Sequence, residues 1–237
     1  MTTPLGLPFY PELPAIYRGV KFQLVQFTAD PAGVAPLLPE LLEPSPDGEC
    51  FAAGLAIPYS SSYGSFEETF LLLKCRFRGQ TGYYCSHVFH NGPAGIAAGR
   101  EIYGTPKIYA KIEITQTASH MRTFATIPGR DAWMSIETDC AEPVAPAELP
   151  GLAPSWRLKL IPRADRPGPA IMQLIDGSGA ARNQVVHVAR RGSGAVSFGP
   201  ALAALRPVST GAAFYLETSY EEHFAEIVHD YLDRGSA

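Results

Sequence analysis

Proline and glycine are spread along the whole chain, and their spacing limits the length of every regular element. The 237 residues contain 22 Pro and 22 Gly, which interrupt helices and strands alike. Between these breaks, Val20–Thr28 (VKFQLVQFT) and Lys107–Thr117 (KIYAKIEITQT) carry alternating apolar residues. Such alternation is typical of half-buried β-strands. The sequence therefore predicts a mainly β, α+β protein built from many strands and turns.

Further strands are predicted where apolar or β-branched runs lie between turn residues. They are Phe51–Pro58, Thr69–Arg78, Gly82–His90, Met121–Ile127, Ala132–Thr138, Trp156–Ile161, Ala170–Ile175, Gln184–Ala189 and Gly211–Tyr220. The link Arg78–Gly82 suits a hairpin. The Pro- and Ala-rich connection Glu142–Pro154 is too short and apolar to be a domain linker, so we expect a single domain over residues 1–237.

A few helices are also expected. Asp30 followed by Pro31 is a good helix start, because the carboxylate caps free N–H groups and the ring pre-sets φ. This short helix should run through Leu42. Residues 93–102 (PAGIAAGREI) are partly helical in pattern, although their glycines weaken the prediction. A C-terminal amphipathic helix, capped by Ser219, is predicted from the 3–4 spacing of Phe224, Ile227, Val228 and Tyr231.

The charge balance limits the class of ligand. The formal net charge is −4, and no run of Lys and Arg appears that could neutralise phosphates. We therefore expect no nucleic-acid partner and a small-molecule ligand instead. The composition, with 46% hydrophobic and 18% charged residues, is that of a globular protein.

The cysteines and the N-terminus indicate the compartment. Cys50, Cys75, Cys85 and Cys140 form no CxxC pair and have no histidine at metal-ligand spacing, so neither a metal nor a cofactor is expected. Residues Met1–Leu13 lack the features of a signal peptide, and no stretch approaches the ~20 apolar residues that span a bilayer. We expect a cytoplasmic protein with reduced thiols and no membrane association.

The segment Asn91–Lys107 (NGPAGIAAGREIYGTPK) is the most informative part of the chain. It is rich in glycine but has neither the GxGxxG nor the GxxxxGK[ST] spacing of phosphate-binding loops. It closely resembles the signature of the acetoacetate decarboxylase family, in which a PA-I-A-x-GRE segment leads to a Pro-Lys pair. In that family the lysine forms a Schiff base with the substrate, and Lys107 matches it.

The resemblance extends over nearly the whole chain in the same order. It includes Phe22–Thr28, the Leu-Pro-Glu-Leu at 38–41, Tyr63–Thr69 (YGSFEET), Trp156–Pro162 (WRLKLIP), Val185–Ala189 and the HDYL at 229–232. It implies a closed, cone-like antiparallel β-barrel with a few peripheral helices. It also implies assembly into a homo-oligomer.

Site residues follow from the same resemblance, position by position. Glu68 matches the family's catalytic glutamate, and Glu67 is the alternative if the register is shifted by one. Arg18 lies next to the position of the family's substrate-binding arginine, which the alignment puts at Gly19. Without the resemblance, Lys107 would be interpreted as an exposed strand residue.

Aromatic residues around these positions are the expected pocket walls. Phe66 precedes the two glutamates, and Tyr103 and Tyr109 flank Lys107 in sequence. We predict that all three contact the substrate.

One departure from the family pattern bears on the chemistry. The decarboxylase that gives the family its name has a second lysine directly after the nucleophilic one, whereas this chain has Ile108. Only a neutral amine can attack a carbonyl, and an apolar pocket disfavours the ammonium form. We therefore expect burial to activate Lys107. Acetoacetate decarboxylase is itself a standard example of lysine activation by a neighbouring cation or by desolvation.

Three functions remain open on the sequence. The first is a Schiff-base lyase that decarboxylates a small β-keto acid. The second is a pyruvate-dependent aldolase–dehydratase that uses the lysine enamine. The third is a non-catalytic small-molecule binder with the same fold, against which Lys107 and Glu68 both argue.

Overall fold

Strands make up most of the chain. The computed structural model describes residues 8–10 and 12–233. The strands are β1 (Ala15–Thr28), β2 (Glu43–Pro44), β3 (Glu49–Ile57), β4 (Tyr59–Ser60), β5 (Phe66–Phe77), β6 (Gln80–His90), β7 (Lys107–Tyr109), β8 (Lys111–Gln116), β9 (His120–Thr126), β10 (Trp133–Pro143), β11 (Ser155–Pro162), β12 (Pro169–Asp176), β13 (Ala181–Phe198), β14 (Ser209–Glu222) and β15 (Glu226–Asp230). The predicted mainly β class is confirmed.

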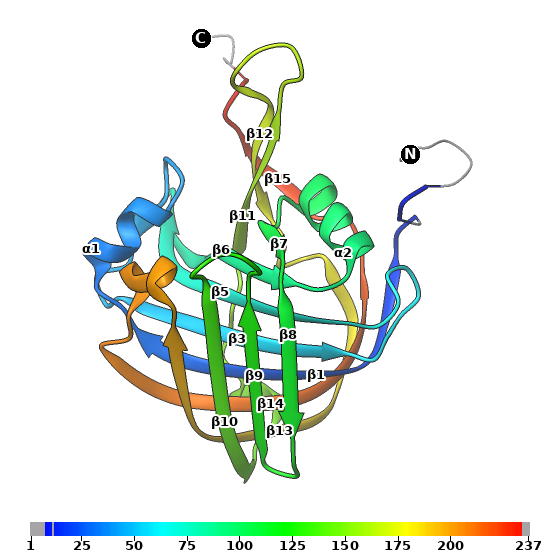
Figure 1. Cartoon of the computed structure of the whole chain (residues 1–237), viewed down its shortest axis with the longest axis vertical. Coiled ribbons are helices and arrows are strands. Elements are labelled where there is room, and N and C mark those ends of the chain that lie inside the picture. The colour runs from blue at the N-terminus through cyan, green and yellow to red at the C-terminus, as the bar shows by residue number, and fades with distance from the viewer. Residues whose placement is uncertain (1–7, 11, 234–237) are drawn as a thin grey trace.

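The helices are short and lie at the periphery (Figure 1). They are α1 (Pro31–Val34) with the 3₁₀ turn η1 (Ala35–Leu37), α2 (Pro93–Ala98) with the π-helical turn η2 (Gly99–Tyr103), and the 3₁₀ turns η3 (Pro146–Glu148) and η4 (Pro200–Leu205). As predicted, the Asp30 carboxylate caps α1, accepting from the amide of Ala32 at 2.9 Å. The first helix is shorter than predicted, because helical structure ends at Leu37. In the part of the chain that the structure describes, no helix is long and apolar enough to cross a membrane.

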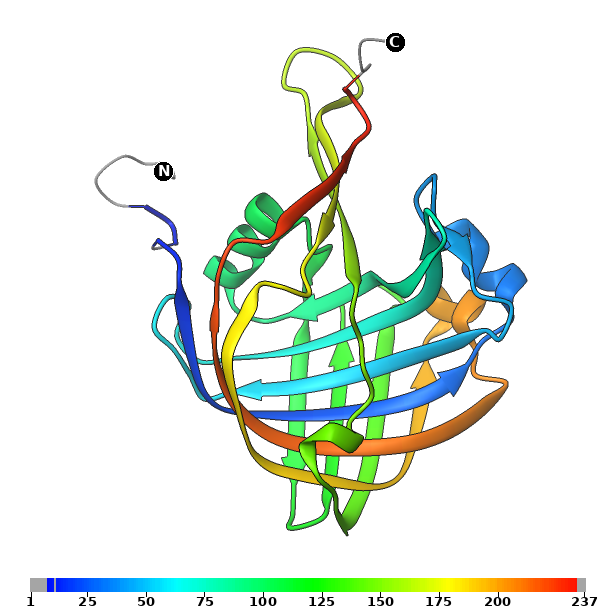
Figure 2. The ribbon, with the colours of Figure 1, turned by 180° about the vertical axis from the view of Figure 1, so that it is seen from behind.

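The strands form one strongly curved sheet, in the order β15-β12-β11-β6-β5-β3-β1-β14-β13-β10-β9-β8. In Figure 1, β8, β9 and β10 run in front of the long strands β1, β3 and β14, which cross behind them. Strands β11, β12 and β15 leave this body and project beyond it, as Figure 2 also shows from behind. The sheet thus curls back on itself, and its two crossing layers enclose the main core.

The predicted barrel requires one correction, because hydrogen bonds do not close it. Among the described strands, no ladder joins the end strand β8 to β6. Instead, β7 runs parallel to β6, with Lys107 opposite Val88. The amide of Ala110 then donates to the carbonyl of His90 at 3.0 Å, and β8 begins beyond it. The predicted strand Lys107–Thr117 is therefore two strands, broken at Ala110.

Alternation along the long strands gives the sheet two buried faces. On β5, Leu71 and Leu73 belong to a buried cluster that also contains Met121 of β9 and Met134 and Ile136 of β10. This cluster is the core between the two layers.

The opposite face of the sheet is also covered. Leu72 of β5 and Val88 of β6 belong to a second buried cluster, against which Leu149 and Leu152 of the connection after β10 pack. Figure 2 shows this connection crossing the back of the long strands. Strands buried on both faces have room for polar side chains only where a cavity or a partner receives them.

The hairpin between β5 and β6 is a two-residue turn. Phe77 pairs with Gln80, and the intervening Arg78 and Gly79 have φ of 50° and 81°. Two positive φ values in succession are typical of the type I′ turn, which matches the twist of a hairpin. The predicted hairpin is confirmed.

The predicted C-terminal helix is wrong. Residues Glu226–Asp230 form strand β15, in which Ile227 pairs with Ile175 of β12. Ser219, the predicted helix cap, lies inside β14, where its hydroxyl accepts from the amide of Gly19. Because β12 would otherwise be an open sheet edge, pairing with it outweighs the helical spacing of the apolar residues.

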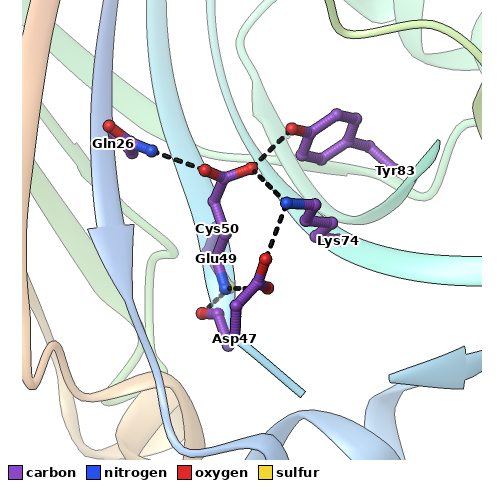
Figure 3. A network of polar contacts seen from close by, with 7 residues as sticks. Gln26, Asp47, Glu49, Cys50, Lys74 and Tyr83 are labelled. Carbon is purple, nitrogen blue, oxygen red and sulfur yellow. Dashed lines mark hydrogen bonds and ion pairs between the residues drawn. The ribbon is translucent and has the colours of Figure 1, made fainter. Parts of the chain in front are cut away.

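A network of hydrogen bonds and ion pairs links β1, β3, β5 and β6 (Figure 3). At its centre, Glu49 accepts from the Gln26 amide at 2.5 Å and from the Tyr83 hydroxyl at 2.7 Å. Lys74 lies 3.2 Å from the same carboxylate and 2.7 Å from Asp47. Its hydrogen bond to Asp47 is the main reason that the pKa of Lys74 is raised. One carboxylate thus receives three donors from three different strands.

Replacement of Glu49 tests this network. In Glu49→Ala, the partly buried donors of Gln26 and Tyr83 lose their acceptor and Lys74 keeps only Asp47, so we expect the free energy of unfolding to fall by about 1–3 kcal/mol. Urea denaturation followed by circular dichroism measures it. Tyr83→Phe is the matched control, since it removes a single hydrogen bond and should cost ~1 kcal/mol or less. A Glu49→Ala protein as stable as the wild type would contradict this role.

Candidate active site

The glycine-rich segment after β6 folds over Lys107. Helix α2 and the turn η2 bring Gly95 and Gly99 to one face, against the side chains of His90 and Lys107. A Cβ atom on Gly99 would lie 2.6 Å from Cδ of Lys107, and one on Gly95 would lie 2.7 Å from Nε2 of His90. These glycines weaken the helix locally, yet they are required because no larger side chain fits above the lysine and the histidine.

The chain then turns sharply just before Lys107. Gly104 ends the helical turn with φ of 69°, in the left-handed region that glycine adopts without strain. A Cβ at this position would also lie 2.5 Å from the backbone of Lys159. Lys107 follows at the start of β7, and its amide donates to the carbonyl of Thr105 at 2.8 Å.

Alternation on β5 decides which of the two adjacent glutamates faces the lysine. Glu68 lies on the same face as Phe70 and Leu72, and its carboxylate oxygen is 2.7 Å from Nζ of Lys107. Glu67 points to the other side of the strand, where its carboxylate accepts from the side-chain amide of Asn91. The structure thus brings Glu68, and not Glu67, to Lys107.

The Lys107–Glu68 pair is largely buried, with 13% of each side chain exposed. Burial raises the pKa of the Glu68 carboxyl, but the charge of Lys107 and the further nearby donors together outweigh it, and the pKa lies below its ordinary value. The same oxygen forms no aligned hydrogen bond with any described residue. The close contact is therefore an ion pair that leaves the carboxylate free to accept from a ligand. The pocket around the lysine is less apolar than expected.

His90 lies beneath this pair and is fully buried. Its Nδ1 accepts from the amide of Gly92 at 2.8 Å, which leaves the proton of the neutral ring on Nε2, 3.6 Å from Glu68. Burial, followed by the charge of Lys107, lowers the pKa of His90 to about 4. The ring stacks on Phe66, with centroids 4.4 Å apart. His90 is thus a neutral support for the glutamate.

A cavity of about 420 Å³ opens above the pair. Lys107, Glu68 and Tyr103 line it together with Glu222, at the end of β14, and Arg157 of β11. This volume suits a small organic molecule. Charged groups therefore converge on one small space.

Glu222 differs electrostatically from Glu68. Burial raises its pKa above the ordinary value, and the charge of Lys107 only partly offsets this effect. The hydroxyl of Tyr17 donates to Glu222 at 2.9 Å. Burial also raises the pKa of Tyr17, so the tyrosine stays a donor. Two carboxyl groups in one cavity thus have pKa values shifted in opposite directions, a common feature of acid–base sites.

Comparison with known proteins shows which family the chain belongs to. The family model described as Acetoacetate decarboxylase (ADC) matches residues 2–232. The chain belongs to the acetoacetate decarboxylase family. It is 30% identical to acetoacetate decarboxylase 2 of Mesorhizobium japonicum, over 98% of this chain and 90% of the relative. It is 26% identical to the acetoacetate decarboxylase of Acidiphilium cryptum, over 97% and 94%.

Solved structures share the fold. The acetoacetate decarboxylase of Legionella pneumophila has a TM-score of 0.85 at 22% identity, covering 98% of this chain and 94% of its own. The enduracididine biosynthesis enzyme MppR, complexed with pyruvate, has a TM-score of 0.76 at 19% identity, covering 97% of both chains. At these identities the likeness establishes the curled sheet and not the reaction.

The other predicted site residues lie at different distances from the cavity. Tyr103 is buried in its wall, and its hydroxyl donates to the carbonyl of His223 at 3.0 Å. Phe66 stands behind the lysine, whose Nζ is 5.8 Å from the ring centroid. Arg18 is exposed, and Tyr109 is 54% exposed; neither lines the cavity. Direct substrate contact by Arg18 or Tyr109 therefore has no support from this geometry.

Sequence reasoning missed Arg157 and Glu222. Both stand in strand patterns where charged residues usually face water, and no motif marks them. His90 appeared only as a strand histidine. In the described ranges, no group of three or more His, Cys, Asp or Glu side chains is arranged to hold a metal ion.

The raised pKa of Glu222 predicts a specific pH dependence of stability. A carboxyl whose pKa is higher in the folded protein stabilises it fully below the unfolded pKa, and this contribution is lost as pH rises through the folded pKa. Glu222→Gln removes the titration and keeps an acceptor for Tyr17. The stability of the variant relative to the wild type should therefore increase as pH rises above about 4, the ordinary pKa of a glutamate.

Urea unfolding at several pH values measures this trend. Glu221→Gln is the matched control, because hydrogen bonds from His223 and Asn183 lower the pKa of Glu221. Its contribution is present at high pH and lost as pH falls, so its variant should show the opposite trend. Parallel trends in the two variants would rule out the burial argument for Glu222.

Proposed function

We propose that the protein is a carbon–carbon lyase that forms a Schiff base between Lys107 and the ketone of a small oxo acid. The observation that carries this proposal is the Lys107–Glu68 pair, 2.7 Å apart at the base of a cavity of about 420 Å³. A lone structural ion pair would not need an open cavity above it. Membership of the acetoacetate decarboxylase family supports the same chemistry.

Imine formation requires a neutral amine and a route for protons. Glu68 takes the ammonium proton of Lys107, and the freed lone pair attacks the carbonyl carbon to form the C–N bond. The oxygen accepts a proton and the nitrogen releases one to a carboxylate, which gives a neutral carbinolamine; after a second proton the oxygen leaves as water and the C=N bond forms. Glu68 supplies one of these protons, and Glu222, whose raised pKa favours its protonated form, can supply the other.

Decarboxylation of a β-keto acid is the first candidate for the next step. The bond to the carboxyl carbon breaks, CO₂ leaves, and the electron pair moves into the positively charged imine to give an enamine. The enamine carbon then takes a proton, and water hydrolyses the imine to release a ketone and the lysine. The names of the curated relatives, acetoacetate decarboxylases at 30% and 26% identity, favour this reaction.

Aldol addition and dehydration through a pyruvate enamine is the second candidate. Dehydration needs a base that removes a proton from carbon and an acid that protonates the departing hydroxyl. The opposite pKa shifts of Glu68 and Glu222 suit these two roles. Ile108, in place of the family's second lysine, favours this branch as well, and MppR is a fold relative whose structure contains pyruvate.

Borohydride trapping tests the proposed imine. Incubation with pyruvate, and separately with acetoacetate, followed by borohydride should leave a covalent adduct on Lys107, detected by peptide mass spectrometry. Lys107→Ala should lose the adduct completely. Lys111→Ala is the matched control, since this exposed lysine lies on the same segment, and its variant should trap normally. No adduct with either acid would instead support the non-catalytic binder.

The reaction that follows imine formation is tested by measuring its products and by replacing Glu68 and Glu67. CO₂ release from acetoacetate identifies the decarboxylase, whereas trapping of pyruvate without CO₂ release from acetoacetate identifies the aldolase branch. In either case Glu68→Gln should slow turnover by about 10²–10⁴-fold, because the proton carrier at the amine is lost. Glu67→Gln is the matched control for turnover, because its carboxylate lies on the other side of β5. An equal loss in both variants would disprove the assignment to Glu68.

A further inference from the structure

Arg157 brings a second cation into the cavity. It lies on β11 opposite Ile175 of β12, and its side chain lines the cavity with Lys107 and Glu68. Its Nε atom is buried and has no hydrogen-bond partner among the described residues. A buried guanidinium donor without an acceptor lowers the stability of the folded protein, so the position of Arg157 needs an explanation.

Gly177 makes room for this guanidinium. A Cβ atom at position 177 would lie 1.5 Å from Nη1 of Arg157 and 2.5 Å from Cζ. The glycine is held in place on both sides: its amide donates to the carbonyl of Ser155 at 2.8 Å, and its carbonyl accepts from Ala180 at 3.1 Å. The guanidinium therefore lies against the backbone of Gly177, where no side chain would fit.

Arg157 shares the cavity with two carboxyl groups, and its charge lowers the pKa of both Glu68 and Glu222, but it contacts neither directly. Arg157 forms no ion pair with a carboxylate of residues 8–10 or 12–233. Glu68 is already paired with Lys107, and Glu222 accepts from the hydroxyl of Tyr17. The thiol of Cys85, which also lines the cavity, has a pKa raised by burial to about 11 and is neutral at pH 7.

The cavity is thus lined both by the amine of Lys107 and by a guanidinium whose buried Nε has no hydrogen-bond partner among the described residues. Guanidinium groups match carboxylates in shape, because two parallel N–H donors meet two oxygens. Arg18, the arginine that the sequence suggested for this task, is exposed and outside the cavity.

We propose that Arg157 binds the carboxylate of the substrate whose ketone reacts with Lys107, and that it selects oxo acids over neutral ketones. This inference rests on the proposed function, since it concerns the same cavity and the same imine. Gly177 acts as a positioning residue, because it determines where the guanidinium lies.

The test compares a charged and a neutral ketone. Pyruvate and acetone are titrated separately, and the adduct on Lys107 after borohydride is quantified by mass spectrometry. Arg157→Met keeps the length of the side chain without its charge, and it should raise the pyruvate concentration for half-maximal trapping about 10- to 100-fold. Trapping of acetone should stay within about 2-fold of the wild type, because no charge-assisted hydrogen bond is lost.

A second pair of variants leaves the arginine in the sequence. Gly177→Ala should displace the guanidinium and weaken pyruvate trapping in the same way. Gly179→Ala is its control, because a Cβ there meets no atom within 4 Å and its φ is not positive. This control variant should trap both ketones normally.

Two outcomes overturn the inference: unchanged pyruvate trapping in Arg157→Met, or an equal loss for pyruvate and acetone. The second would indicate that Arg157 only supports the structure. If the wild type gives no adduct with any ketone, the proposed function fails, and calorimetric titration of pyruvate still tests the inference. Binding to the wild type that is lost in Arg157→Met supports the carboxylate site, and equal heats in both proteins refute it.

Discussion

The burial of both faces of β5 is the constraint on which the site depends. Side chains alternate strictly along a strand, so a shift of one residue would exchange the two faces. Leu71 and Leu73 fix the register by entering the core between the crossing layers. Glu68 is then directed to the opposite face, where Lys107 is its nearest cation. The apolar core thereby determines which of two neighbouring glutamates meets the lysine.

The glycine-rich segment completes this arrangement from the other side. Gly95 and Gly99 allow α2 and η2 to approach His90 and Lys107 closely. Their low helix propensity is outweighed by packing, as tertiary contacts commonly outweigh propensity. The same close approach removes water from the lysine and leaves one open side, toward the cavity. A segment whose glycines weakened its helical prediction thus forms the cover over a largely buried amine.

The electrostatics of the cavity follow from how each charge is compensated. Lys107 and Glu68 compensate each other, whereas burial raises the pKa of Glu222. Arg157 has no such partner among the described residues. In the proposed complex, the carboxylate of an oxo acid would be the acceptor for this guanidinium.

The sequence by itself determined the strand-rich class, the hairpin at Arg78, and the pairing of Lys107 with a glutamate, because alternation, turn chemistry and a family signature are local patterns. It could not determine that 226–230 forms a strand, since an unpaired edge of β12 exists only in the folded sheet. Arg157 and Gly177 were equally invisible, because they come together only where β11 and the turn after β12 meet. Only tertiary structure brings such residues into one cavity and decides which charges are left without a partner.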